Sequence, residues 1–289
     1  MAPRLSARSL LRAPVVLVIV GICSVQFGAG IAKTLFDEAS PTTLVWLRLA
    51  FSTLILLAVV RPRLRGRSRA DWLVVIGFGL ALGSMNWAIY QSFARIPIGI
   101  AVTIEFVGPL SIALFSSRRP RDLLWVLLAA TGVLLLGLSP GDITAAGVGF
   151  ALLAGAAWAC YILLSKSTGA RWQGLDGLAM ASLVATLAIA PIQLSGHAGE
   201  LMSGHLLAVG ALVGLMSSVI PYSAELVALR SLRPGTFGIL MSLEPAFAAL
   251  AGFVIVSENL SLAQWAALAC VVIASVGVTR RNPPAPAPN

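Results

Sequence analysis

Long apolar runs are the feature that most limits what this chain can fold into. They are about 18–22 residues long and are separated by short polar breaks, as expected for helices that cross a bilayer. The chain is 58% hydrophobic and 11% charged, whereas soluble domains average about 45–50% and about 25%. The alternating pattern of a membrane β-barrel is absent. The sequence therefore predicts an all-α membrane protein with ten transmembrane helices, at residues 14–36, 42–60, 72–93, 97–116, 123–138, 147–165, 175–195, 205–229, 234–256 and 261–279.

Basic residues are distributed unevenly among the polar breaks. Seventeen of the 20 Lys and Arg residues lie at the two termini or in alternate loops, for example 61–69 and 118–121. The intervening loops carry acidic residues such as Glu200 and Glu258. Because positively charged loops stay on the cytoplasmic side of a membrane, both termini are predicted to be cytoplasmic.

The chain is predicted to contain two five-helix halves, residues 1–138 and 147–279, followed by a disordered, Pro-rich cytoplasmic tail at 280–289. The features that recur in both halves are Lys33 and Lys166, Gly79-xxx-Gly83 and Gly210-xxx-Gly214, and a glutamate close to a proline in spans four and nine. Each half crosses the membrane five times, which is an odd number. The second half must therefore enter the membrane from the opposite side, which makes an inverted repeat. The alternative is a chance similarity between segments rich in Leu, Ala and Gly.

Three glutamates lie inside the apolar runs: Glu105, Glu225 and Glu244. A charge at mid-membrane costs roughly 2.5–3.5 kcal/mol on insertion scales, so such residues usually face the interior of a bundle or a water-filled cavity. Pro109 and Pro245 are expected to bend their helices by removing a backbone hydrogen bond. A bent helix beside a carboxylate suits a polar substrate or a proton. Glu225, near the cytoplasmic end of span eight, could instead lie at the membrane interface.

Arg48 is the basic residue that lies deepest within a span. A buried arginine needs a carboxylate partner, or can bind a substrate carboxylate through two parallel hydrogen bonds. A structural ion pair between Arg48 and one of the glutamates is therefore the alternative to a binding site. Lys33 and Lys166, near the ends of their spans, are expected to extend to the membrane interface.

Neutral polar side chains are concentrated in spans one, three and eight. Any one of them is typical of a hydrogen bond between helices, but together they would suit a polar cavity. The members of this set are Gln26, Asn86, Tyr90, Gln91 and Tyr222.

The sequence carries no signature of catalysis, of a cofactor or of nucleic-acid binding. The glycines of the segment 77–79 precede no strand that could form a dinucleotide site. The three cysteines have neither CxxC spacing nor a nearby histidine, so no metal is expected. The net charge of +9 comes from short loops rather than from one helix face. We expect no enzyme activity, no cofactor and no nucleic-acid partner. The expected partners are a small-molecule substrate and the lipid bilayer, and a homodimer stays open.

Several stretches resemble a known family over almost the whole chain apart from the tail. They are PIGIAVTIEFVGPLSIALFSSRRP (97–120), GAAWACYILLSK (155–166), IPYSAELVALRSL (220–232) and FGILMSLEPAFAALAGF (237–253). These segments are similar to the drug/metabolite transporter superfamily, in particular to the threonine/homoserine exporter branch of its EamA-type members. The resemblance implies export of small amino acids across the bacterial inner membrane, driven by the proton-motive force.

The expected mechanism is alternating access around a cavity lined by spans one, three, four, six, eight and nine. Glu105 or Glu244 is assigned to the substrate ammonium or to the coupling proton. Arg48 is assigned to the substrate carboxylate or to holding a glutamate ionised. A glutamate that alternates between an apolar environment and Arg48 could exchange one proton per cycle. The alternatives are a transporter of another metabolite or drug, an importer included, and more remotely a membrane-embedded enzyme or an assembly factor.

Overall fold

The computed structural model describes residues 7–115, 123–138, 143–221 and 234–281, together with positions 224, 228 and 232. The described residues form helices joined by turns, without a strand. The α-helices are α1 (Ala7–Lys33), α2 (Pro41–Val60), α3 (Arg69–Phe93), α4 (Ile98–Glu105), α5 (Val107–Phe115), α6 (Leu123–Leu138), α7 (Ala145–Gly169), α8 (Asp176–Gly196), α9 (Gly204–Gly214), α11 (Pro234–Met241), α12 (Glu244–Val256) and α13 (Leu262–Arg281). A 3₁₀-helix, η2, covers Ala198–Met202, and a π-helix, η3, continues α9 over Leu215–Val219.

Six helical segments of the described chain are long and apolar enough to cross a membrane, and shorter apolar helices accompany them. The prediction of an all-α membrane protein is therefore confirmed, while the count of ten crossings stays a prediction. The first helix ends at Lys33, close to the predicted end at residue 36, and residues 34–38 form a turn.

Polar caps fix where several helices begin. The Ser40 hydroxyl accepts a hydrogen bond from the Thr43 N–H, and proline follows it at the first position of α2. Ser68 and Asp71 form a reciprocal capping box at the start of α3. Thr144 caps α7 through the N–H of Gly147. Each cap satisfies backbone donors that the first turn of a helix leaves free.

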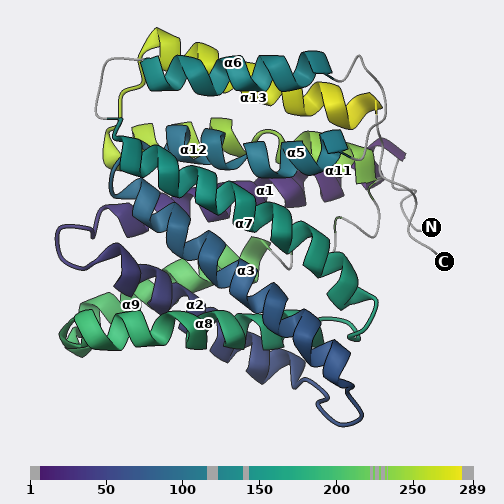
Figure 1. The fold of residues 1–289 in the computed structure, drawn as a ribbon, viewed down its shortest axis with the longest axis vertical. Coiled ribbons are helices and arrows are strands. Elements are labelled where there is room, and N and C mark those ends of the chain that lie inside the picture. Colours follow the sequence, from purple (N-terminus) through teal and green to yellow (C-terminus); the bar gives the residue numbers. More distant parts are fainter. Residues whose placement is uncertain are drawn as a thin grey trace, which may run out of the picture.

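The helices pack as a bundle in which α6 and α13 lie side by side at one edge (Figure 1). Elsewhere α3 packs on α7 and α8, α2 packs on α8 and α9, and α12 packs on α1 and α4. Glycines allow two of these close contacts, as expected from sequence. A Cβ atom on Gly79 would collide with Val184 of α8, and one on Gly214 would press on the carbonyl of Arg48 in α2. Large apolar side chains such as Val59 and Leu73 stay exposed on the outside, where lipid would cover them.

Two apolar spans, the fourth and the ninth, are interrupted next to their glutamates. In span four, the first helix, α4, ends at Glu105, and a second helix, α5, begins at Val107. In span nine, α11 ends at Met241, and α12 begins at Glu244 with Pro245 in its first turn. Proline lacks the N–H that would bond to the carbonyl four residues earlier. The breaks therefore place both carboxyl groups where the regular helix is interrupted.

Candidate transport site

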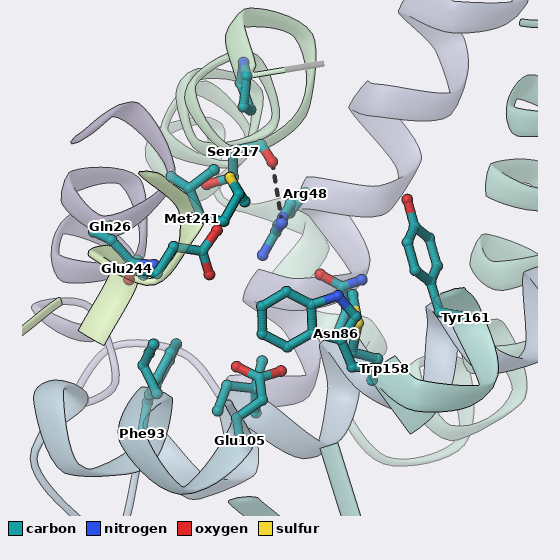
Figure 2. Close-up of a pocket in the computed structure, with 16 residues that line it drawn as sticks. Gln26, Arg48, Asn86, Phe93, Glu105, Trp158, Tyr161, Ser217, Met241 and Glu244 are labelled. Atoms are coloured by element: carbon teal, nitrogen blue, oxygen red, sulfur yellow. Dashed lines mark hydrogen bonds between the residues drawn. The ribbon is translucent and has the colours of Figure 1, made fainter. Parts of the chain in front are cut away.

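A cavity of about 160 Å³ lies in the middle of the bundle. Its walls come from α1, α2, α3, α4 and α7, from the π-helix η3 and from the break between α11 and α12. The side chains expected from sequence that line it are Gln26, Arg48, Asn86, Glu105 and Glu244. Glu105, Glu244 and Arg48 approach it from three different sides (Figure 2).

Arg48 is the cation of this cavity. Only 9% of the residue is exposed. One guanidinium nitrogen, Nη2, donates a 3.1 Å hydrogen bond to the carbonyl oxygen of Ser217 in η3. Nε has no hydrogen-bond partner, and the described part of the chain gives Arg48 no ion pair. Tyr90 is fully buried and places its ring centroid 5.8 Å from the Arg48 Cζ atom. Arg48 is thus held at one nitrogen and keeps further donors for another partner.

Glu105 is the last residue of α4 and is 7% exposed. The described residues give its carboxylate neither a hydrogen bond nor an ion pair, although it experiences the charge of Arg48. The predicted alternative of a direct structural pair between these two residues is therefore not what the structure shows. The opposite charges are buried in the walls of one cavity and are separated by a gap.

Glu244 is the first residue of α12 and is 9% exposed. The unpaired N–H groups at a helix N-terminus favour a negative charge there by about 0.3–1 kcal/mol. In Figure 2 its carboxylate points into the cavity from the side opposite α3 and α7. The start of α12 therefore supports an ionised carboxylate at the cavity wall.

The neutral polar residues do not all reach this cavity. Asn86 uses its Nδ2 to donate to the carbonyl of Leu82, which leaves its side-chain oxygen available. Gln91 instead donates to Thr42 and accepts a hydrogen bond from Arg95, and it does not line the cavity. The positions of Glu225 and Tyr222 lie outside the described residues.

Sequence reasoning missed several wall residues, because most of them are apolar. They are Val25, Ala29, Met85, Ile89, Phe93, Val102, Trp158, Tyr161, Ser217, Pro221 and Met241. Helical spacing could have found some of them. Residues 86, 89 and 93 form one stripe along α3, and Trp158 and Tyr161 are three residues apart on α7.

Charged groups also connect helix ends at the other end of the bundle from the arginine-rich turn 61–68. Lys33 was expected to extend to the membrane interface, but its Nζ lies 2.6 Å from a carboxylate oxygen of Glu258 and donates to the carbonyl of Ile96 at 2.8 Å. The other Glu258 oxygen accepts from the N–H of Ile98, the first residue of α4. A nearby carboxylate at a helix N-terminus explains why this lysine turns inward.

Comparison with known proteins identifies the family. The sequence profile of the EamA-like transporter family matches residues 145–280. The threonine/homoserine exporter RhtA of Salmonella typhimurium is 40% identical over 276 residues, which are 93% of each chain. RhtA of Escherichia coli K12 is 40% identical over 269 residues, 92% of this chain and 91% of that protein. A solved crystal structure of another protein, 18% identical, covers 92% of this chain and 98% of its own with a TM-score of 0.63, which shows a shared fold.

These relatives are named as transporters rather than enzymes. Together with the apolar helices, they make this chain a multi-pass protein of the bacterial inner membrane. The chain belongs to the EamA-like transporter family and resembles its RhtA exporters.

Proposed function

We propose that this protein exports small amino acids of the threonine and homoserine type from the cytoplasm, by proton-coupled alternating access. The names of its relatives support the substrate class. The observation that carries the proposal is that Arg48, Glu105 and Glu244 are buried around one cavity, in which Arg48 and Glu105 form no direct ion pair. A zwitterion offers a carboxylate to the arginine and an ammonium group to a carboxylate, so it fits between such groups.

The size of the cavity favours an amino acid over a drug. Pockets for drug-sized ligands are roughly 300–1,000 Å³, whereas this cavity has a volume of about 160 Å³. A threonine-sized solute suits the smaller volume. This argues against the alternative of a multidrug exporter, while another small metabolite or transport inward stays an outcome of the substrate test below.

The two glutamates suit different tasks. Glu244 begins α12, whose N-terminus favours a charged carboxylate, so we assign it to the substrate ammonium. Glu105 has no hydrogen bond to give up within the described structure, and we assign it to the coupling proton. Because an opposite charge favours the ionised form, the ammonium group of a substrate that enters from the cytoplasm causes Glu105 to release its proton to the cytoplasm. After the substrate has left on the outside, Glu105 takes up a proton there, and the return of the empty protein carries that proton inward.

Alternating access needs one end of the cavity to be closed while the other opens. The contact of Lys33 with Glu258, and of Glu258 with the start of α4, joins the first half of the chain to the second at the end opposite the arginine-rich turn. If the basic loops are cytoplasmic, this contact closes the outer end. We propose that it separates when substrate leaves the cell.

An inverted repeat would supply the two exchangeable states. In the two proposed halves, α3 corresponds to α9 and α8 corresponds to α2. The contact of α3 with α8 therefore corresponds to the contact of α9 with α2, and both pairs pack together in the structure. The glycines Gly79 and Gly214 lie at these two contacts. The interrupted helices α4–α5 and α11–α12 also correspond in the two halves. This pairing supports the proposed halves 1–138 and 147–279.

Efflux of labelled threonine and homoserine tests the function, in cells that lack their own exporters, with and without an uncoupler. The expected result is uncoupler-sensitive efflux from the wild type. Glu105→Gln is expected to lose proton-driven efflux but to keep exchange of labelled for unlabelled threonine, while Glu244→Gln loses both. Glu38→Gln, an exposed change, is the control. Absence of efflux above the empty vector, at normal membrane levels, would refute the proposed substrates, and a wider panel assayed in both directions would then identify others.

A further inference from the structure

A second cavity, of about 180 Å³, lies between α3, α7 and α8, beside the turn that connects α7 to α8. It is at the end of the bundle that carries the arginine-rich turn 61–68. Arg67 of that turn donates to the carbonyl of Arg171 and places its Cζ 4.4 Å from the ring centroid of Trp172, which lines the cavity. If the basic loops are cytoplasmic, this cavity is on the cytoplasmic side.

The walls of this second cavity combine hydroxyl groups with aromatic rings and glycines, and none of the residues that line it is charged. Ser165 and Thr168 contribute hydroxyl groups from α7, and Trp172 and Phe78 contribute aromatic rings. Thr168 is only 3% exposed, and its hydroxyl has no hydrogen-bond partner in the described structure. A buried hydroxyl without a partner is unfavourable unless a polar solute satisfies it. Without an opposite charge, such a wall suits brief contact with a small hydroxylated solute rather than tight binding.

Tyr161 belongs to both cavities. It lines the central cavity together with Arg48 and Glu105, and it lines the second cavity together with Thr168. Its ring packs against Phe78 of α3 with centroids 4.9 Å apart. Figure 2 shows Tyr161 standing at the edge of the central cavity. A rotation of this one ring would change the wall between the two spaces.

We propose that the second cavity is a vestibule through which a small hydroxylated amino acid enters from the cytoplasm, and that Tyr161 is the gate between vestibule and central cavity. This inference depends on the proposed export function. The vestibule would hold the substrate weakly, through hydroxyl groups, before Arg48 and the glutamates bind its charges.

A pair of serine variants on α7 tests the route. Ser165 lines the vestibule, and its hydroxyl donates to the carbonyl of Ile162 in the same helix. Ser165→Leu should therefore replace a hydroxyl group of the vestibule wall with a larger apolar side chain. Ser167→Leu changes an exposed serine of the same helix that does not line the vestibule, and it is the matched control. Threonine efflux should fall at least several-fold in the first variant and stay normal in the second, at equal membrane levels. Equal efflux from both would overturn the vestibule.

Cysteine labelling gives an independent measurement. In a variant without Cys23, Cys160 and Cys270, Ser165→Cys should react with a membrane-impermeant maleimide in inside-out vesicles but not in intact cells. Saturating threonine should slow this reaction several-fold, and serinamide, which lacks the carboxylate, should slow it about as well. Labelling from the outside, or labelling that threonine does not slow, contradicts the inference. A wild type that exports no threonine refutes the proposed function itself, whereas normal export with unprotected Ser165→Cys refutes the vestibule alone.

Discussion

At the scale of single residues, the site depends on how the structure holds one buried arginine. The π-helix η3 presents the carbonyl of Ser217 to Arg48, and such wide turns are frequent at functional sites. The Tyr90 ring packs near the guanidinium. Arg48 is thus oriented by neutral groups instead of by a carboxylate. Its charge remains available to a ligand, which is the basis of the assignment to the substrate carboxylate.

Replacing Arg48 should therefore impair substrate binding more than folding. Arg48→Met removes the cation but retains an unbranched apolar side chain. A hydrogen bond to a charged group contributes about 1.5–3 kcal/mol, so the apparent affinity for threonine should fall roughly tenfold to a hundredfold. Arg48→Lys should restore little of it, because a point charge cannot bond to Ser217 and to a carboxylate in the same fork geometry. Efflux measured over a range of internal threonine concentrations checks this, and an unchanged affinity would contradict the assignment.

Glu200 provides a pH-dependent contact outside the spans. Burial raises the pKa of its carboxyl group, but hydrogen bonds from Thr43, the Ser40 N–H and His197 outweigh this, so the pKa is lowered overall. A lowered pKa in the folded state adds stability above the ordinary value of about 4.3, and this stability is lost as the pH falls through the folded value. The Tm of the purified wild type should thus be higher than that of Glu200→Gln above about pH 5, and this difference should disappear between about pH 5 and pH 3. A constant difference in Tm across that range would refute the role of this carboxylate.

At the scale of elements, close helix packing surrounds the cavity. Gly99 of α4 faces α12, where an added Cβ would lie 2.7 Å from the Cα of Ala249. Such overpacking costs about 1–3 kcal/mol. Gly99→Ala should accordingly lower Tm by several degrees. Gly149→Ala has open space and better helix propensity, so its Tm should stay the same or rise. Thermal unfolding of both variants in detergent checks this, and equal Tm values would show that α4 and α12 do not pack as described.

The helices themselves explain how much of the site could be predicted from sequence. A charge or an amide inside an apolar run is visible in the sequence, so Arg48, Glu105 and Asn86 could be identified. Gln91 looked equivalent to Asn86, but five residues turn the helix by roughly 140° relative to the first position, and Gln91 contacts Thr42 instead. Phe93 and Met241 could not be separated from lipid-facing residues by type, because both environments are apolar.

Long helices were predictable because a run of apolar residues long enough for a bilayer has few other stable structures. The π-helix and the inward orientation of Lys33 were not. Both depend on partners far along the chain: Arg48 bonds to η3 across 169 positions, and Glu258 reaches Lys33 from the second half. A single sequence contains no local signal for such contacts.

At the scale of the whole molecule, the contact between Lys33 and Glu258 predicts which variants favour an open outer end. Glu258→Gln removes the charge that holds both Lys33 and the start of α4. In the cysteine-free variant, Ala29→Cys lines the central cavity, and the Glu258 change should increase its labelling from outside the cell several-fold. Glu38→Gln, at the same end but exposed, is the control. Unchanged labelling in Glu258→Gln would mean that this contact does not close the cavity.

The central claim is that the cavity recognises a zwitterion through opposite charges on its walls. Binding to the purified protein tests it most directly, with threonine compared with threoninol, which keeps the ammonium and the hydroxyl groups but lacks the carboxylate. The wild type should bind threonine at least about tenfold more tightly than threoninol. Arg48→Met should abolish this preference by weakening threonine alone. Equal binding of the two compounds by the wild type, or a preference that survives in Arg48→Met, would contradict the account.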